Sequence, residues 1–115
     1  MKTEITYNKL IRDKIPAIIK ADGNLPVVTV LDDDDYMDAL NTKLHEEVTE
    51  YLADNRLEEL CDILEVVFAI ARAKGFSEND IERHRNAKNL TNGAFDDKLF
   101  LVKVIAEDNE THNRY

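Results

Sequence analysis

The chain has 115 residues, the length of one ordinary domain, so we predict a single domain spanning residues 1–115. An apolar fraction of 43% beside 34% charged residues excludes a fibrous or disordered class. The net charge of −9 argues against polymeric nucleic acid as a partner, and it means that any phosphate ligand needs a cation to screen it.

The cysteine content and hydropathy indicate a compartment. Cys61 is the only cysteine, so no disulfide can form within the chain. No segment approaches the roughly 20 apolar residues that span a bilayer, and the N-terminus has no apolar signal region. We therefore expect a cytoplasmic protein with no membrane partner.

A short helix and a strand are the first elements predicted. Pro16 suits a first helical turn, and the apolar residues around it end before Gly23, which predicts a helix from about residue 13 to 21. After Pro26 comes a β-branched run, residues 27–31, which is typical of a strand. A strand this short needs a partner.

Two long helices follow. The aspartates at 32–35 favour a helix start, because carboxylates there accept hydrogen bonds from free N–H groups and complement the macrodipole. Apolar residues then recur at steps of three and four from Tyr36 to about residue 54, which indicates an amphipathic helix. Asn55 and Glu58 have the form of a capping box that opens a second helix, ending at Gly75.

The C-terminal third is predicted to hold a polar helix and a second strand. Ser77 and Asp80 resemble a helix cap, opening a helix to about residue 90 before an Asn-Gly turn at 92–93. Residues 98–107 alternate like a strand and are the natural partner of 27–31. The predicted fold is an all-α helical bundle with a small two-stranded β-ribbon.

The second long helix predicts self-association. It has a main apolar face around Leu60 and Leu64 and another around Ile63, Val66 and Ile70. One neighbouring helix cannot cover both faces, so we expect a homodimer or a larger homo-oligomer.

Each long helix also carries the acidic pattern EExx[ED], at residues 46–50 and 58–62. Acids three residues apart share one side of a helix. In both copies the pair borders apolar positions, where converging carboxylates would raise one another's pKa unless a cation neutralised them. We predict four metal ligands, namely Glu47, Glu50, Glu59 and Asp62.

Magnesium is the expected ion, with manganese possible, because an all-carboxylate site without His or Cys favours these ions over zinc. Magnesium commonly shares its coordination with substrate phosphate, so a phosphate-bearing substrate follows. The alternative is a solvated helix face on which Lys43 pairs with Glu47.

Other candidates for chemistry are weaker. His45 is interpreted as a solvated polar residue, and Cys61 as a small buried side chain without an aligned histidine. Tyr51 and Phe68 could stack on a base, but core packing is the favoured role for both.

The acidic motifs resemble those of the all-α nucleoside triphosphate pyrophosphatase superfamily, the MazG-like and phosphoribosyl-ATP pyrophosphohydrolase-like proteins. EEVTE at 46–50 and ELCD at 59–62 are similar to its EExxE and ExxD motifs. YNKLIRDKIP at 7–16 is similar to the start of one MazG-like subgroup, and KNLTNGAF at 88–95 to a KxxxRGGF element. The resemblance spans most of the chain.

The resemblance implies that Glu47, Glu50, Glu59 and Asp62 hold magnesium. A nucleotide would be cleaved between its α and β phosphates into a monophosphate and pyrophosphate. Glu46, also in the motif, would orient or deprotonate the attacking water.

The sequence departs from the family pattern where Asn92 replaces an arginine and Ala94 a glycine, so one phosphate contact is lost. A net acidic protein must gather positive groups near a phosphate ligand, and four candidates remain: Lys9, Arg12, Lys14 and Lys88. Two alternatives stay open. One is phosphoribosyl-ATP hydrolysis, and the other is a non-catalytic helical module that binds a nucleotide or a partner chain.

Overall fold

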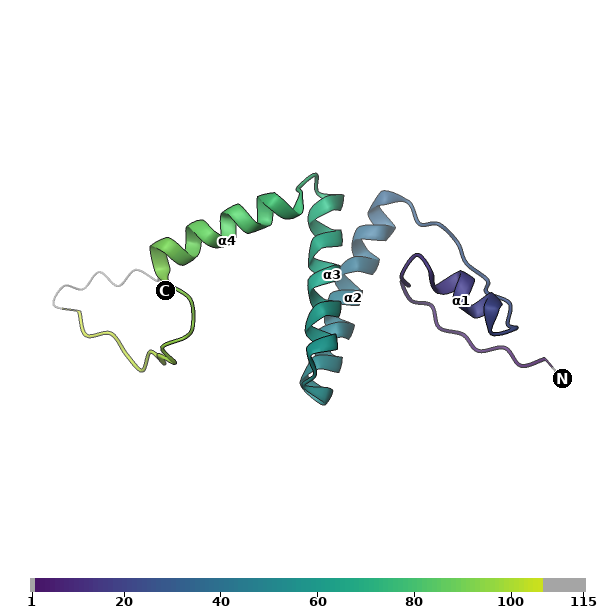
Figure 1. The fold of residues 1–115 in the computed structure, drawn as a ribbon, viewed down its shortest axis with the longest axis horizontal. Coiled ribbons are helices and arrows are strands. Elements are labelled where there is room, and N and C mark those ends of the chain that lie inside the picture. The colour runs from purple at the N-terminus through teal and green to yellow at the C-terminus, as the bar shows by residue number, and fades with distance from the viewer. Residues whose placement is uncertain (1, 107–115) are drawn as a thin grey trace. The chain divides into compact units, whose positions relative to one another are not determined.

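The computed structural model describes residues 2–106, and every regular element in that range is an α-helix. Figure 1 shows the four helices: α1 (Ile15–Ala21), α2 (Asp33–Asp54), α3 (Leu57–Ala73) and α4 (Glu78–Asn92). The all-α class predicted from the sequence is therefore confirmed. None of these helices is both long and apolar enough to cross a lipid bilayer.

The backbone divides into two compact units, Met1–Glu82 and Arg83–Tyr115, with the boundary inside α4. The first unit contains α1, α2 and α3, and all the acidic residues of the predicted site belong to it. That a single domain covers residues 1–115 stays a prediction.

Local capping explains where α1 and α2 begin and end. α1 has Pro16 in its first turn and ends at Ala21, two residues before Gly23, whose φ of +84° is reached by glycine at low cost. α2 begins as predicted, because the side chain of Asp32 accepts a hydrogen bond of 2.8 Å from the backbone N–H of Asp35. α2 closes at Asn55, which has a left-handed φ of 55° and donates its N–H to Tyr51 at 2.7 Å.

The predicted capping box of Asn55 and Glu58 is wrong. Asn55 ends α2 instead of opening α3, since asparagine tolerates the left-handed conformation that closes a helix. The N-cap of α3 is Arg56, which makes no side-chain capping bond and instead donates to Glu59. At its other end α3 stops at Ala73, and the left-handed residue predicted to close it, Gly75, follows two residues later with a φ of +89°.

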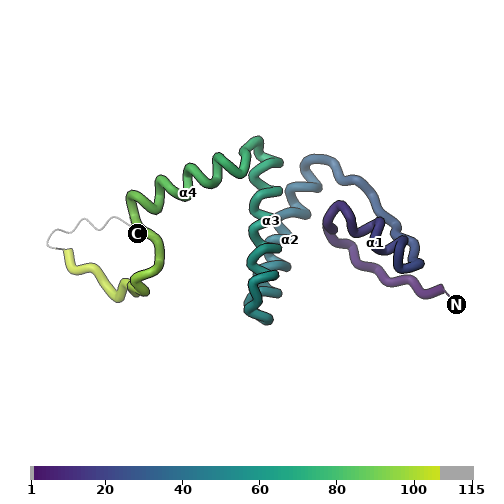
Figure 2. The backbone as a smooth tube through the Cα atoms, viewed as in Figure 1, coloured from purple at the N-terminus to yellow at the C-terminus, as the bar shows by residue number. Residues whose placement is uncertain are grey.

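α2 and α3 form an antiparallel hairpin, joined by residues 55–56 and lying side by side (Figure 1, Figure 2). The apolar core of the described residues is small, with Leu40 of α2 at 2% exposure and Val66 of α3 at 7%. Glu59 lies seven residues before Val66, on the same side of α3, and is also buried. The second apolar face of α3 is therefore the covered one.

The N-terminal half of the main apolar face of α3 is open to solvent: Leu57, Leu60 and Leu64 are 74%, 41% and 51% exposed. The same choice of face corrects the expectation for Cys61, which is exposed instead of buried. Two apolar faces compete for one neighbouring helix, and only one can pack against it.

The β-ribbon is not supported within residues 2–106. Residues 27–31 and 98–106 contain no strand, while Glu107 of the second predicted strand lies outside the described range. Val30 is 97% exposed and Phe100 is 88% exposed. Since a two-stranded ribbon needs a hydrophobic face to pack on, β-branched composition alone does not form it.

The cap of α4 is confirmed. The backbone N–H of Ser77 donates to Asp80 at 2.8 Å, and the backbone N–H of Asp80 donates to the Ser77 hydroxyl at 3.1 Å. α4 ends at Asn92 and is followed by Gly93 with a φ of +81°, which agrees with the predicted turn.

Candidate functional site

Glu47 is a buried carboxylate on the inner side of α2. Its exposure is 7%, and its Oε2 atom is buried without a hydrogen-bond partner among the described residues. Its Oε1 lies 3.4 Å from the Nζ of Lys43, one turn earlier. Burial raises the pKa of Glu47, and the neighbouring Glu50 raises it further, while Lys43 lowers it in part.

Glu59 is the corresponding carboxylate on α3 and is 4% exposed. Its Oε1 accepts two hydrogen bonds from the Arg56 guanidinium, at 2.9 and 3.1 Å, while its Oε2 is buried without a partner among residues 2–106. The hydrogen bonding from Arg56 holds the pKa of Glu59 below its ordinary value, although burial acts in the opposite direction. The same pair raises the pKa of Arg56.

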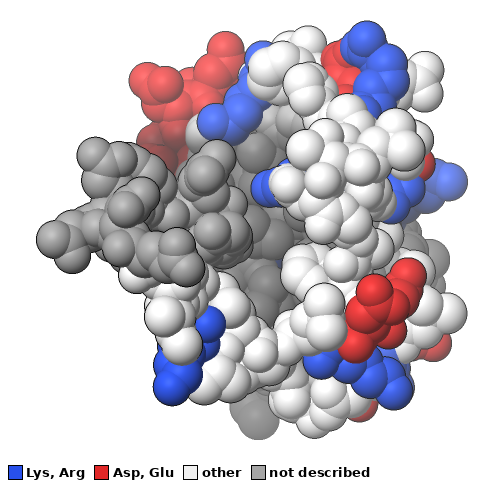
Figure 3. Space-filling view, turned by 90° about the vertical axis from the view of Figure 1, so that its left-hand side faces the viewer, with Lys and Arg blue, Asp and Glu red and all other residues white. Residues whose placement is uncertain are grey.

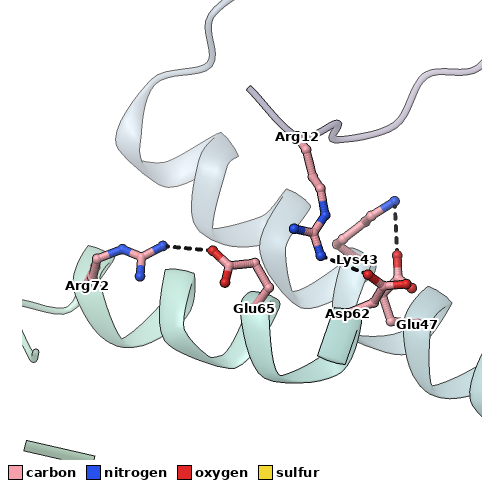
Figure 4. Close-up of polar contacts among 6 residues, drawn as sticks. All are labelled: Arg12, Lys43, Glu47, Asp62, Glu65 and Arg72. Carbon is pink, nitrogen blue, oxygen red and sulfur yellow. Dashed lines mark hydrogen bonds and ion pairs between the residues drawn. The ribbon is translucent and has the colours of Figure 1, made fainter. Parts of the chain in front are cut away.

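Asp62 lies one turn after Glu59 and faces the N-terminal segment. Its Oδ1 accepts a hydrogen bond of 2.8 Å from Nη2 of Arg12, fifty residues away in the chain (Figure 4). The two side chains are 38% and 58% exposed, respectively. This pair ties residues near the N-terminus to the α2–α3 hairpin.

A pocket of about 410 Å³ lies between residues 10–14, α2 and α3. Apolar side chains that include Tyr36, Leu40 and Val66 line part of it. Glu47 and Asp62 belong to the same lining, so one carboxylate from each helix borders this space. The volume and the mixture of apolar and charged groups suit a small-molecule site.

Four basic side chains line the pocket: Arg12, Lys14, Lys43 and Arg72. Arg12 and Lys14 are two of the predicted phosphate contacts. The sequence pattern indicates Lys43 only as a partner of Glu47. It gives no signal for Arg72, which pairs with Glu65 at 3.4 Å (Figure 4). Four acidic side chains line the same pocket, namely Asp13, Glu47, Asp62 and Glu65. That the basic side chains contact a phosphate stays a prediction.

The remaining phosphate candidates do not line this pocket. Lys9 is exposed and places its Nζ 5.5 Å from the centre of the Tyr7 ring, a cation–π contact. Lys88 lies on α4 in the second unit.

Three of the four predicted metal ligands are paired with basic side chains. Within the described residues, no group of three or more His, Cys, Asp or Glu side chains is arranged to hold a metal ion. Each paired carboxylate is turned toward its own cation, namely Lys43, Arg56 or Arg12, and Glu50 is exposed. The metal site stays a prediction.

Glu46, the predicted base, lies beside this cluster. Its Oε1 is 3.7 Å from the Nζ of Lys43, and its side chain is 35% exposed. Lys43 is therefore shared between Glu46 and Glu47. His45, which the sequence interpretation left out of the site, is exposed.

Arg56 is the other residue that sequence reasoning missed. A signal for it existed, because an arginine three residues before a glutamate at a helix start can reach that carboxylate. With Asn55 interpreted as the N-cap, Arg56 falls inside the predicted helix and has no capping role there.

Comparison with known proteins assigns no family. No family model matches the chain, and no solved structure matches it. An uncharacterized protein of Mycolicibacterium smegmatis is 51% identical over 45 residues, which cover 39% of this chain and 46% of that protein. The match thus spans about half the length of that relative.

Proposed function

We propose that this chain is a magnesium-dependent nucleotide pyrophosphohydrolase, which cleaves a nucleoside triphosphate between its α and β phosphates to a monophosphate and pyrophosphate. One observation carries the proposal. Glu47 and Glu59, on adjoining helices, are both more than nine-tenths buried, and each leaves one carboxylate oxygen without a partner in residues 2–106. Buried carboxylate oxygens of this kind are costly unless a ligand meets them.

The oxygen chemistry of the four predicted ligands suits a hard divalent cation. Glu47, Glu50, Glu59 and Asp62 would supply only carboxylate oxygen, which magnesium and manganese prefer. The bound ion would polarise the phosphates and lower the pKa of a coordinated water. Asp62 is half-exposed at the edge of the pocket, where a ligand can reach it from solvent.

The other residues of the site have separate roles in this proposal. Arg12 and Lys14 would contact phosphate oxygens, because both line the pocket beside Asp62. Glu46 would accept a proton from the attacking water, since it adjoins Glu47 in the chain and its side chain is partly open to solvent. Lys9 and Lys88 have no support of this kind from the pocket.

We also propose that the protein is a cytoplasmic homodimer or larger homo-oligomer, in keeping with its single cysteine and the open face of α3. Leu57, Leu60 and Leu64 would pack against a second copy. Both basic and acidic side chains lie at the surface seen in Figure 3. The net charge of −9 favours a nucleotide instead of a polymeric nucleic acid as ligand. Light scattering with a Leu60→Glu, Leu64→Glu variant would test the association.

A non-catalytic nucleotide-binding or partner-binding module is the second candidate. It is favoured by Asn92 in place of arginine and by the basic partners that Glu47, Glu59 and Asp62 already have. Hydrolysis of phosphoribosyl-ATP remains an alternative within the enzyme class, because it would use the same groups on another substrate.

Pyrophosphate release separates these candidates. Canonical and modified nucleoside triphosphates and phosphoribosyl-ATP would each be incubated with the protein and magnesium. We expect release from at least one substrate, and a loss of at least about a hundred-fold in the Glu47→Gln, Glu50→Gln variant. Glu58→Gln is the matched control, since Glu58 is an exposed acid of the same motif outside the proposed site. Release that is equal in the wild type and the double variant contradicts the proposal.

A further inference from the structure

Asp62 and Arg12 each have a role in the proposed function, and those two roles conflict in the observed geometry. Asp62 Oδ1 lies 2.8 Å from Arg12 Nη2, so this oxygen faces a guanidinium (Figure 4). A divalent cation on the same oxygen would stand beside that positive group and be repelled by it. The two cations therefore compete for this oxygen.

We propose that Arg12 is an exchangeable counter-ion. A divalent cation takes Asp62 from Arg12, and the released guanidinium then contacts the phosphates of the ligand. This inference rests on the proposed function and adds an order of events, with the cation first and an oligophosphate second.

The exposure of this pair suits an exchange. Arg12 and Asp62 are 58% and 38% exposed, and ion pairs open to water contribute little net free energy. The Arg56–Glu59 pair differs, because Glu59 is 4% exposed and receives two hydrogen bonds from one guanidinium. Arg12 can therefore leave its carboxylate far more easily than Arg56 can.

The charge of the pocket explains why the divalent cation would bind before the oligophosphate. Its lining contains four basic and four acidic side chains, so the charges are balanced and attract an anion weakly. A bound divalent cation makes the lining net positive and also frees Arg12 to donate to phosphate. The ligand that gains most is a di- or triphosphate, because it can meet the cation and the guanidinium together.

Calorimetry on the full chain tests the exchange with magnesium alone and then with pyrophosphate at saturating magnesium. In Arg12→Gln, magnesium should bind about two- to five-fold more tightly, the range expected for loss of an exposed competing pair. Pyrophosphate should bind roughly ten-fold more weakly, because a charge-assisted hydrogen bond is lost. Tighter magnesium binding together with weaker pyrophosphate binding in this variant is the result that the exchange predicts.

Arg72→Gln is the matched control. It removes one positive charge from the same pocket, but Arg72 pairs with Glu65 and Glu78, which are outside the proposed metal ligands. The gain in magnesium affinity should therefore be larger in R12Q than in R72Q. Equal gains in the two variants, or weaker magnesium binding in R12Q, overturn the exchange.

Asp62→Asn separates this inference from the proposed function. If D62N binds magnesium as tightly as wild type, Asp62 is not a ligand, and both proposals fail. If D62N weakens magnesium binding and R12Q does not strengthen it, only the exchange is wrong. Hydrogen–deuterium exchange gives a second measurement, since magnesium alone should raise exchange at residues 10–14 in the wild type and leave it unchanged in R12Q.

Discussion

Glu47 on α2 and Glu59 on α3 are alike in burial and opposite in electrostatics. Both are more than nine-tenths buried, and both have a basic side chain within one turn. Yet burial holds the pKa of Glu47 above its ordinary value, whereas hydrogen bonds from Arg56 hold that of Glu59 below it. The strength of the hydrogen bonding from the neighbouring basic side chain, and not burial alone, sets the direction of the pKa shift.

The details of the two pairs explain the difference. Arg56 donates two hydrogen bonds to one oxygen of Glu59, at 2.9 and 3.1 Å. Lys43 stands 3.4 Å from Glu47 and is shared with Glu46, while Glu50 adds negative charge nearby. Glu47 is therefore the less compensated carboxylate, and a cation would relieve it most.

The largest effect is expected from Leu40→Ala, which removes the most buried apolar side chain of α2. Leu40 lies two turns before Glu47 on the same side of the helix. The free energy of unfolding should fall by about 2–5 kcal/mol, the range for truncating a buried leucine. Urea denaturation measures this loss.

The same substitution probes the comparison, because opening this face lets water reach Glu47. Its pKa should return toward the ordinary value of 4.5, whereas that of Glu59 should stay low. NMR titration of the side-chain carboxyl groups would measure both pKa values. Equal movement of both pKa values would contradict the contrast between the two sites.

Arg56→Gln should be the next most damaging change. It leaves Glu59 buried without its two charge-assisted hydrogen bonds, which is costlier than removing both partners. We expect Tm to drop by several degrees. Arg72→Gln is the control, since Arg72 and Glu65 are 50% and 47% exposed, and it should change Tm little.

The parts of this arrangement that the sequence could predict are local. Asp32, Gly23 and the Ser77–Asp80 pair act within a few residues of themselves, so the ends of the helices followed from them. The prediction of the β-ribbon was wrong because a strand needs a partner that lies far away in the sequence. The interpretation of Asn55 was wrong because asparagine is common at both ends of helices.

The candidate site likewise contains local ion pairs, which the sequence can predict, and one distant ion pair, which it cannot. Lys43–Glu47 and Arg56–Glu59 are pairs three or four residues apart, within the reach of helical spacing. Arg12 and Asp62 are fifty residues apart, and no periodicity relates them. The sequence also could not predict which apolar face of α3 is buried, because that depends on how α3 packs against α2.

Replacing each glutamate by glutamine should change stability in opposite directions. Glu47→Gln removes an unfavourable charge and lets the new amide donate to Glu50, so Tm at pH 7 without magnesium should rise slightly. Glu59→Gln loses the charge-assisted bonds from Arg56, so Tm should fall. Thermal melts with circular dichroism measure both, and changes of the same sign would contradict the comparison.

The smallest effect, and the finest test, is the pH dependence of unfolding. Glu59 has a lowered pKa, so the stability it contributes is present above its unfolded value, near 4.5, and is lost as pH falls through the lowered pKa. Glu47 has a raised pKa, so its favourable contribution is present below 4.5 and is lost as pH rises through the raised value. The midpoint of urea denaturation would be measured from pH 3 to 8. In E59Q the midpoint should no longer fall as the pH is lowered below about 4.5, and in E47Q it should no longer fall as the pH is raised above about 4.5. Should E47Q alter the acid side instead, Glu47 is the better compensated carboxylate, and magnesium would have less reason to bind beside it.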